Sequence, residues 1–171
     1  MNLRNLALDV ALEAVGRMNP REGVMRILEK ERFSGEVVLL SLGKAGWSMA
    51  EAALEVLGSR ISRGLVVTKY GHSRGPLGDL EIIEAGHPLP DQNSLRAGEK
   101  GFALAENLSS EDTLLLLVSG GGSALFELPL EGVTLGDMES LTGQLLRAGA
   151  DIREINSLRK RLSRVKGGRL A

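Results

Sequence analysis

The feature that most constrains this sequence is a short apolar run that ends in a glycine-bearing turn and leads directly into a helical pattern. Residues 36–42 read Glu-Val-Val-Leu-Leu-Ser-Leu, and Gly-Lys-Ala-Gly follows at 43–46. Apolar residues then recur at helical spacing from Met49 to Leu57, and Gly58 suits the position just after a helix. A strand that is apolar nearly throughout is typical of a sheet covered on both faces. The segment therefore predicts a strand, a tight turn and a helix.

The same alternation continues along the chain. Further strands are predicted at 63–69, 80–84 and 113–119, and helices at 2–17, 21–32, 92–107, 135–148 and about 152–163. Asp91 and Thr134 suit the N-cap positions of two of these helices. Because parallel neighbours need crossover connections, strands alternating with helices predict an α/β fold. We expect one main domain with a Rossmann-like, mostly parallel sheet and helices on both faces.

Composition excludes several classes of protein. The 171 residues include no cysteine, so disulfides, thiolate zinc sites and cysteine nucleophiles are excluded, and a reducing cytoplasm is the expected location. The first segment carries Arg4, Asp9 and Glu13, unlike a secretory signal, and the longest apolar run, 114–118, is too short to cross a bilayer. The sequence therefore predicts a cytoplasmic protein without membrane contact.

Charge is distributed unevenly. Residues 151–171 hold seven basic and two acidic residues, a net charge of +5, whereas the whole chain carries −1. Such asymmetry suits an anion site or a nucleic-acid patch. Aromatic residues make up 3% of the chain, which leaves few platforms for stacked bases. Small anions are therefore favoured, and nucleic-acid binding through the basic tail is the weaker hypothesis.

Two glycine-bearing strand ends, 43–46 and 119–123, are the first candidates for a ligand site, because ligands of parallel sheets gather at the carboxyl ends of strands. Glycines let backbone N–H groups approach an anion, and Lys44 adds a full positive charge. Neither segment matches the dinucleotide fingerprint or the P-loop. A flexible turn and a solvated surface lysine are the alternative interpretations. The residues alone predict an anion-binding α/β domain.

Other polar residues suit the same anions. His72 and His87 each follow a glycine in a loop and could donate hydrogen bonds to a phosphate or carboxylate, or serve structure alone. Without carboxylates at ligand spacing they do not predict a metal site. Arg159, Lys160 and the turn at 166–169 offer further cations, with a solvated charge run as the alternative.

Several motifs, in order, resemble those of the glycerate 2-kinase family whose carboxy-terminal half is called the MOFRL domain. They are Gly-Lys-Ala at 43–45, Lys-Tyr-Gly-His at 69–72, Glu-Ala-Gly-His-Pro at 84–88, Ser-Gly-Gly-Gly-Ser-Ala-Leu at 119–125, residues 149–156, and Lys-Gly-Gly-Arg-Leu-Ala at 166–171. The resemblance covers nearly the whole chain. It implies ATP-dependent phosphorylation of D-glycerate at its 2-hydroxyl, giving 2-phosphoglycerate, with Mg²⁺ bound to the nucleotide.

The resemblance also implies roles for individual residues. Lys44 matches the family's catalytic lysine. Residues expected to bind the cofactor ATP are Ser119, Gly120, Gly121, Gly122, Ser123, Lys166, Gly167, Gly168 and Arg169. Residues expected to bind glycerate are Lys44, His72, His87, Arg159 and Lys160. The family's catalytic arginine belongs to the second domain. We therefore expect residues 1–171 to be the amino-terminal domain, interrupted before the MOFRL domain and inactive alone.

Two other functions remain open at this point. One is a non-catalytic anion- or nucleotide-binding module that works with a separate partner. The other is the hydroxypyruvate reductase label that some members of the family carry, which the absence of a nicotinamide fingerprint argues against. The expected partners are D-glycerate, a nucleotide and the missing carboxy-terminal domain. The sequence leaves open whether the protein forms a homo-oligomer and which enantiomer it prefers.

Overall fold

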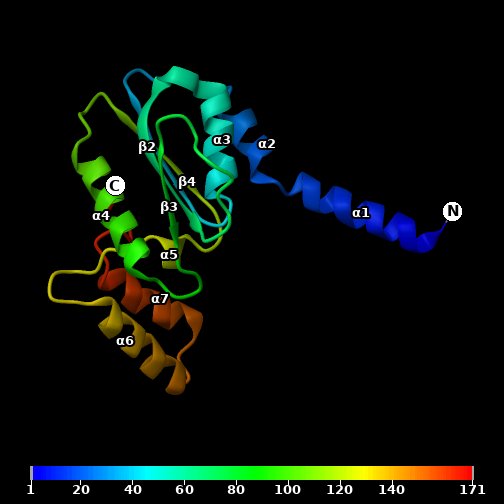
Figure 1. Cartoon of the computed structure of the whole chain (residues 1–171). Helices are drawn as coiled ribbons and strands as arrows, with labels where there is room; N and C mark the ends of the chain where they lie inside the picture. Colours follow the sequence, from blue (N-terminus) through cyan, green and yellow to red (C-terminus); the bar gives the residue numbers. More distant parts are fainter. Residues whose placement is uncertain (1, 171) are drawn as a thin grey trace.

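The computed structural model describes residues 2–170, so Ala171 of the last motif lies outside the described residues. Its centre is a four-stranded, all-parallel sheet in the order β3-β2-β1-β4 (Figure 1). The strands are β1 (Val37–Leu42), β2 (Ile61–Lys69), β3 (Glu81–Ala85) and β4 (Thr113–Val118). At the carboxyl end of β1, Leu42 is paired with Val67 on one side and Val118 on the other. The predicted parallel α/β fold is confirmed.

Seven α-helices accompany the sheet within the described residues. They are α1 (Leu3–Arg17), α2 (Pro20–Leu28), α3 (Gly46–Leu57), α4 (Gln92–Glu106), α5 (Gly122–Leu125), α6 (Leu135–Arg147) and α7 (Ile152–Arg161), with a 3₁₀ turn η1 (Gly58–Arg60) before β2. Asp91 and Thr134 cap α4 and α6 as predicted. The second helix ends at Leu28, whereas the sequence predicted that it would continue to residue 32.

Each face of the sheet is covered by its own hydrophobic core. On one face, Leu39 and Val66 pack with residues of α2 and α3 such as Leu28 and Trp47. On the other face, residues of α4, α5 and the segment 163–170 pack against strand residues such as Leu40. Alternating side chains of a strand point to opposite faces, so β1 is buried along its whole length and contributes to both cores. The expectation of helices on both faces is confirmed.

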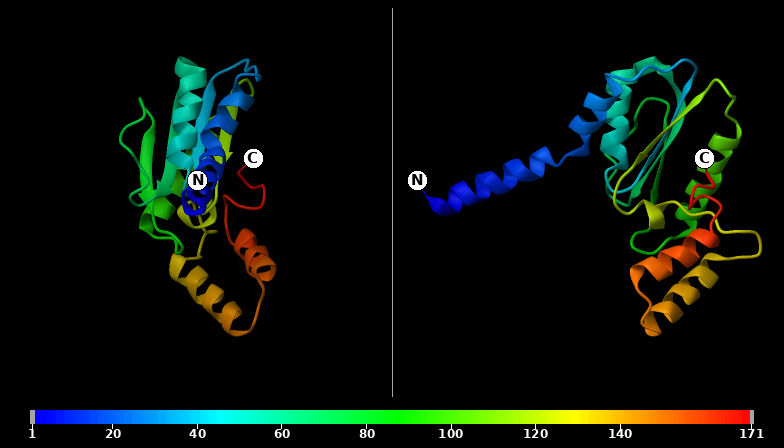
Figure 2. Two further views of the ribbon diagram at one scale, coloured as in Figure 1. Left: turned by 90° about the vertical axis from the view of Figure 1, so that its right-hand side faces the viewer. Right: turned by 180° about the vertical axis from the view of Figure 1, so that it is seen from behind.

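Two parts of the chain extend beyond this sandwich (Figures 1 and 2). Helix α1 projects away from the sheet and has no buried residue. Helices α6 and α7 form a pair beyond the carboxyl ends of the strands, where α5 also lies. Between residues 2 and 170, no helix combines the length and the apolar character needed to span a membrane. The helical pair thus places the basic residues of α7 at the sheet end where ligands are expected.

Candidate functional site

The two glycine-bearing strand ends are joined to each other. The backbone N–H of Lys44 donates to the carbonyl of Gly120 at 2.9 Å. The Oγ of Ser119 accepts from the N–H of Ala45 at 3.0 Å and donates to the carbonyl of Leu42 at 3.2 Å. The sequence placed Ser119 among the residues that bind the cofactor, but its hydroxyl is used to connect the loops. Its place in the structure suits a positioning role.

Lys44 and His87 meet at Gly121. A Cβ atom added to Gly121 would lie 2.9 Å from Cδ2 and 3.1 Å from Nε2 of His87, and 3.4 Å from Cγ of Lys44. Gly121 also has a φ of 93°, in the left-handed region that favours glycine. His72, from the loop between β2 and β3, contacts the Lys44 turn, with its Nδ1 3.1 Å from the carbonyl oxygen of Lys44. The structure therefore brings the predicted lysine and both predicted histidines together.

A polar cavity of about 220 Å³ lies beside Lys44, and one of the side chains that line it, Arg74, was missed by sequence analysis. Its lining includes Ser48, His72 and Arg74. The Arg74 guanidinium lies over the ring of Trp47, 5.7 Å from its centroid, and the Trp47 indole N–H donates to the carbonyl of Gly75 at 2.8 Å. The one sequence signal for the place of Arg74 in this cavity is its position two residues after the Tyr-Gly-His motif. The lining of the cavity includes two cationic side chains, Lys44 and Arg74, and no acidic one.

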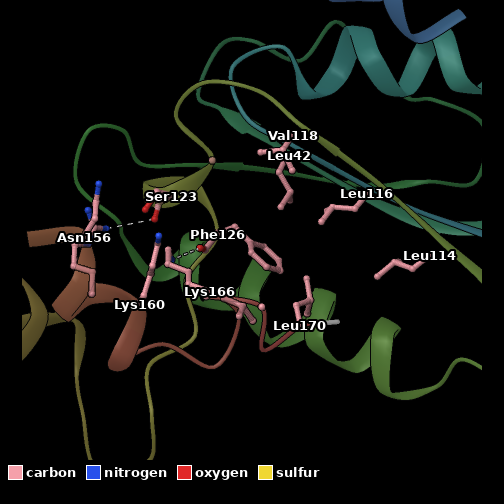
Figure 3. Close-up of a pocket in the computed structure, with 15 residues that line it drawn as sticks. Leu42, Leu114, Leu116, Val118, Ser123, Phe126, Asn156, Lys160, Lys166 and Leu170 are labelled. Atoms are coloured by element: carbon pink, nitrogen blue, oxygen red, sulfur yellow. Dashed lines mark hydrogen bonds between the residues drawn. The ribbon is translucent and has the colours of Figure 1, made fainter. Parts of the chain in front are cut away.

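On the other side of the glycine-rich loop lie Arg159 and Lys160 of α7. The Nη2 of Arg159 donates to the carbonyl of Ser123 at 3.4 Å. Arg159, Lys160 and Ser123 all line a larger cavity of about 600 Å³, whose remaining wall is mostly apolar (Figure 3). The loop at 120–123 thus lies between two sets of cations, one around Lys44 and one on α7.

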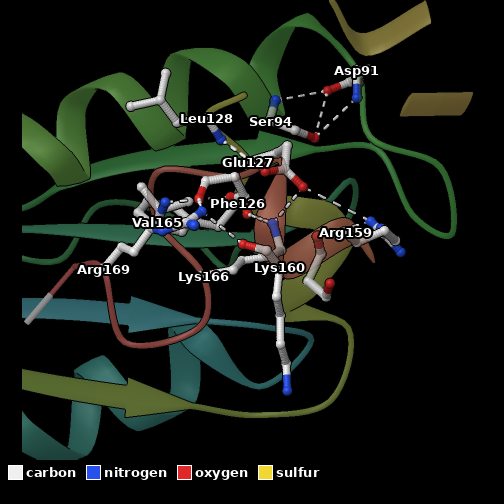
Figure 4. A network of polar contacts seen from close by, with 12 residues as sticks. Asp91, Ser94, Phe126, Glu127, Leu128, Arg159, Lys160, Val165, Lys166 and Arg169 are labelled. Carbon is white, nitrogen blue, oxygen red and sulfur yellow. Dashed lines mark hydrogen bonds and ion pairs between the residues drawn. The ribbon is translucent and has the colours of Figure 1, made fainter. Parts of the chain in front are cut away.

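Lys166 and Glu127 form a buried ion pair. The Lys166 ammonium donates to Oε2 of Glu127 at 2.5 Å and to the carbonyl of Phe126 at 2.8 Å (Figure 4). The Glu127 side chain is fully buried, and Arg159 lies 4.0 Å from the same oxygen. Burial lowers the pKa of Lys166, and the neighbouring carboxylate opposes that shift. The ammonium that the sequence predicted to bind the cofactor is thus paired with an internal acid, and its contact with the cofactor stays a prediction.

Arg169 is also engaged within the protein. Its Nη1 donates to the carbonyls of Lys160, Arg161 and Ser163 at 3.0, 2.9 and 2.7 Å. These carbonyls lie at the end of α7, where a cation also complements the helix dipole. Gly167 and Gly168 have φ values of 67° and 85°, which let the chain turn back toward the helix. Arg169 therefore caps α7, and its predicted contact with the nucleotide stays a prediction.

Glu127 is the polar residue of this region that sequence analysis missed. It stands alone within an apolar stretch, between Phe126 and Leu128. Such an isolated acid predicts either exposure or a buried partner. Its partner is 39 positions away in the chain, so the pairing follows from the fold.

The environment of His87 leads to a prediction about its protonation. Burial lowers its pKa from the usual 6.5, and the charges of Lys44 and Lys69 lower it further. We expect an NMR titration of the His87 ring to have a midpoint below 6.5, and Lys44→Met to raise that midpoint. Because the unfolded chain binds the proton more readily, stability should fall as the pH drops through 6.5 toward the midpoint in the folded state. A midpoint at or above 6.5 would contradict this account.

The site is suited to anions. Among residues 2–170 there is no group of three histidine, aspartate or glutamate side chains that could hold a metal ion. Lys44 of the β1–α3 turn and Arg159 of α7 border the glycine-rich loop, and Arg74 of the β2–β3 loop lines the cavity beside Lys44. Backbone N–H groups in such loops bind phosphate or carboxylate oxygens.

The chain is similar to known proteins in sequence and in fold. The chain is 50% identical to the D-glycerate 2-kinase of Thermotoga maritima over 170 residues, which are 99% of this chain and 40% of the relative. It is 42% identical to a putative hydroxypyruvate reductase of Agrobacterium vitis, over 92% of this chain and 36% of the relative. The crystal structure of Thermotoga maritima glycerate kinase matches with a TM-score of 0.92, 50% identity, and coverage of 98% of this chain and 40% of that one.

The chain thus spans about 40% of the length of the first of these relatives and of the solved structure. A family model described as "Domain of unknown function (DUF4147)" matches residues 6–171, which is nearly the whole sequence. The order of the motifs, the parallel sheet and the joined glycine loops all lie within this matched region. The chain therefore belongs to the DUF4147 family.

Proposed function

We propose that this chain is the amino-terminal domain of a glycerate 2-kinase, which transfers the γ-phosphoryl group of ATP to the 2-hydroxyl of D-glycerate. The observation that carries the proposal is the convergence of Lys44, His87 and the loop at 120–123 at the carboxyl ends of β1 and β4. The names of the similar proteins, glycerate 2-kinase and glycerate kinase, support the same reaction. Both substrates are anions, which suits a site surrounded by cations.

The reaction forms a bond from the 2-oxygen of glycerate to the γ-phosphorus and breaks the bond from that phosphorus to ADP, while the hydroxyl proton leaves. Phosphoryl transfer needs mainly positioning and neutralisation of charge. In our proposal, Lys44 neutralises the moving phosphoryl group or the glycerate carboxylate. The backbone N–H groups of Gly121, Gly122 and Ser123 bind a second set of oxygens.

The remaining charged and polar side chains divide by their availability. Arg159 and Lys160 border the glycine-rich loop from α7 and are proposed to bind a further phosphate or carboxylate. His72, His87 and the newly found Arg74 are proposed to contact substrate oxygens beside Lys44. Lys166 and Arg169 are proposed to hold α7 and its neighbouring segment in position, because their charges are engaged internally.

The described residues do not fit a protein-bound Mg²⁺ ion. That ion prefers carboxylate and phosphate oxygens, whereas the groups around the glycine loops are cationic or neutral. The magnesium that a kinase needs would therefore enter with the nucleotide. The reductase name carried by some relatives finds no support in the glycine loops, because neither has the dinucleotide pattern.

A coupled assay with ATP, magnesium and D-glycerate tests the proposal. We would compare the 171-residue chain with the same chain joined to the complementary 60% of the Thermotoga maritima relative. Turnover in the joined protein, with little in the 171-residue chain, is the expected result. Failure of both proteins to turn over while they still bind ATP or pyrophosphate would overturn the kinase proposal in favour of a binding module.

A further inference from the structure

Strand β4 lies at the edge of the sheet but has the composition of a central strand. It pairs with β1 alone among the described strands, and its sequence is Thr-Leu-Leu-Leu-Leu-Val. Edge strands of stable proteins usually carry charges, prolines or bulges that prevent pairing with other chains. Parallel strands are usually apolar because both of their faces are buried. In β4, by contrast, the side chains of Leu116 and Val118 are 44% and 61% exposed. The edge therefore has no protection against a further strand.

The hydrogen bonds of β4 show which groups are free to pair. The N–H of Thr113 donates to Glu36 and that of Ser119 to Leu42, both at 2.8 Å, so the odd-numbered residues face β1. In a parallel strand, the backbone N–H and C=O of one residue point to the same neighbouring strand, and those of the next residue point to the opposite side. The N–H and C=O groups of Leu114, Leu116 and Val118 consequently face the open edge.

The same three side chains form one wall of the 600 Å³ cavity, which is a groove along β4 (Figure 3). Its opposite wall consists of apolar side chains from the residue after α5 and from the segment that follows α7, among them Phe126, Val165 and Leu170. The polar groups Ser123, Asn156 and Lys160 gather at one end of the groove (Figure 3). Most of the groove is therefore suited to aliphatic side chains.

The connections of the sheet indicate how a further strand would be reached. The chain passes from β1 to β2 over the face covered by α3, and from β3 to β4 over the opposite face, covered by α4. Crossovers between parallel strands are right-handed, so a strand outside β4 must be reached over the α4 face. Segment 163–170 lies on that face: Val165 is in its core, and Leu170 packs against it and lines the groove.

We infer that the open edge of β4 receives a fifth, parallel strand, and that aliphatic side chains next to this strand fill the groove. The occupant is the part of a glycerate-kinase chain that lies beyond the 40% matched by this one. That part is long enough to contain such a strand, and segment 163–170 runs along the face that a right-handed crossover to it requires. The larger cavity is thus a docking groove, and the anions bind at its polar end.

Residue-resolved hydrogen exchange tests this inference without using kinase activity. In the 171-residue chain at low concentration, the amides of Leu114, Leu116 and Val118 should exchange quickly, while those of Leu115 and Leu117 are protected by β1. In the chain joined to the complementary part of the Thermotoga maritima relative, exchange of the three amides should slow by a factor of about 100 or more, as expected for a core strand. If the joined protein does not fold, the aligned amides of the intact relative are measured instead.

Three outcomes would overturn the inference. They are rapid exchange of the three amides in the folded longer protein, protection of all three in the isolated chain at every concentration, and protection that rises with the concentration of the isolated chain, which would assign the edge to a second copy. A matched pair of variants adds a control. Leu116→Asp should restore fast exchange in the joined protein, whereas Leu146→Asp, at an exposed site on α6, should not.

Discussion

Replacing Lys166 by alanine is expected to lower the free energy of unfolding by about 3–5 kcal/mol, because the change leaves the Glu127 carboxylate buried without its partner. Glu127 is fully buried and the Lys166 side chain is 13% exposed, so water replaces little of the lost interaction. Arg159 lies 4.0 Å away and compensates only in part. The backbone N–H of Leu128 remains as a donor to the other carboxylate oxygen.

Urea denaturation followed by circular dichroism measures this effect. Lys160→Ala is the matched control, because that lysine is exposed and should change stability by no more than about 0.5 kcal/mol. The double variant Glu127→Gln with Lys166→Met removes both charges and should lose less stability than Lys166→Ala. Equal unfolding midpoints for Lys166→Ala and the unmodified chain would show that the pair is solvated in solution.

Replacing Lys44 by alanine is expected to reduce kcat in the joined protein by a factor of about 100 to 1,000, the usual cost of removing one group that stabilises developing charge. Lys44 is exposed, and its backbone N–H, which donates to Gly120, is retained in the variant. Stability should therefore change by no more than about 0.5 kcal/mol. The combination of a large rate loss with an intact fold distinguishes a catalytic residue from a structural one.

The coupled kinase assay and a urea titration on the same preparations make this comparison. Lys30→Ala is the control, since Lys30 is an exposed lysine just after α2 and far from the glycine-rich loop. Lys44→Arg retains the charge but changes its position, so partial activity would indicate that charge neutralisation is the larger contribution. An unchanged kcat for Lys44→Ala would remove Lys44 from the mechanism.

These two predictions assign different tasks to the cations that the sequence grouped together. Lys44 and Arg159 lie on either side of the glycine-rich loop. Lys166 and Arg169 hold segment 163–170 against Glu127 and the end of α7. If this division is correct, variants of Lys166 and Arg169 will lower stability, and they will lower activity only by displacing α7.

The fold class and the caps of the helices follow from local patterns. The apolar run at 37–42 with its glycine turn predicts a buried parallel strand, because burial on both faces leaves no polar alternation. Asp91 and Thr134 cap helices through contacts within three residues, so their sequence context is sufficient to predict them. The pairing of the two glycine loops was also foreseeable, since carboxyl ends of parallel strands share one edge.

Which group each charged side chain contacts depends on the packing of distant parts of the chain. Nothing near Lys166 predicts that its ammonium meets Glu127, and nothing near Arg74 predicts its place beside Lys44. Strand β4 shows the same limit: its apolar sequence resembles that of central β1, yet the order of strands places it at an edge. Periodicity along the chain reports how much of an element is buried, whereas the identity of the burying partner arises from the three-dimensional arrangement.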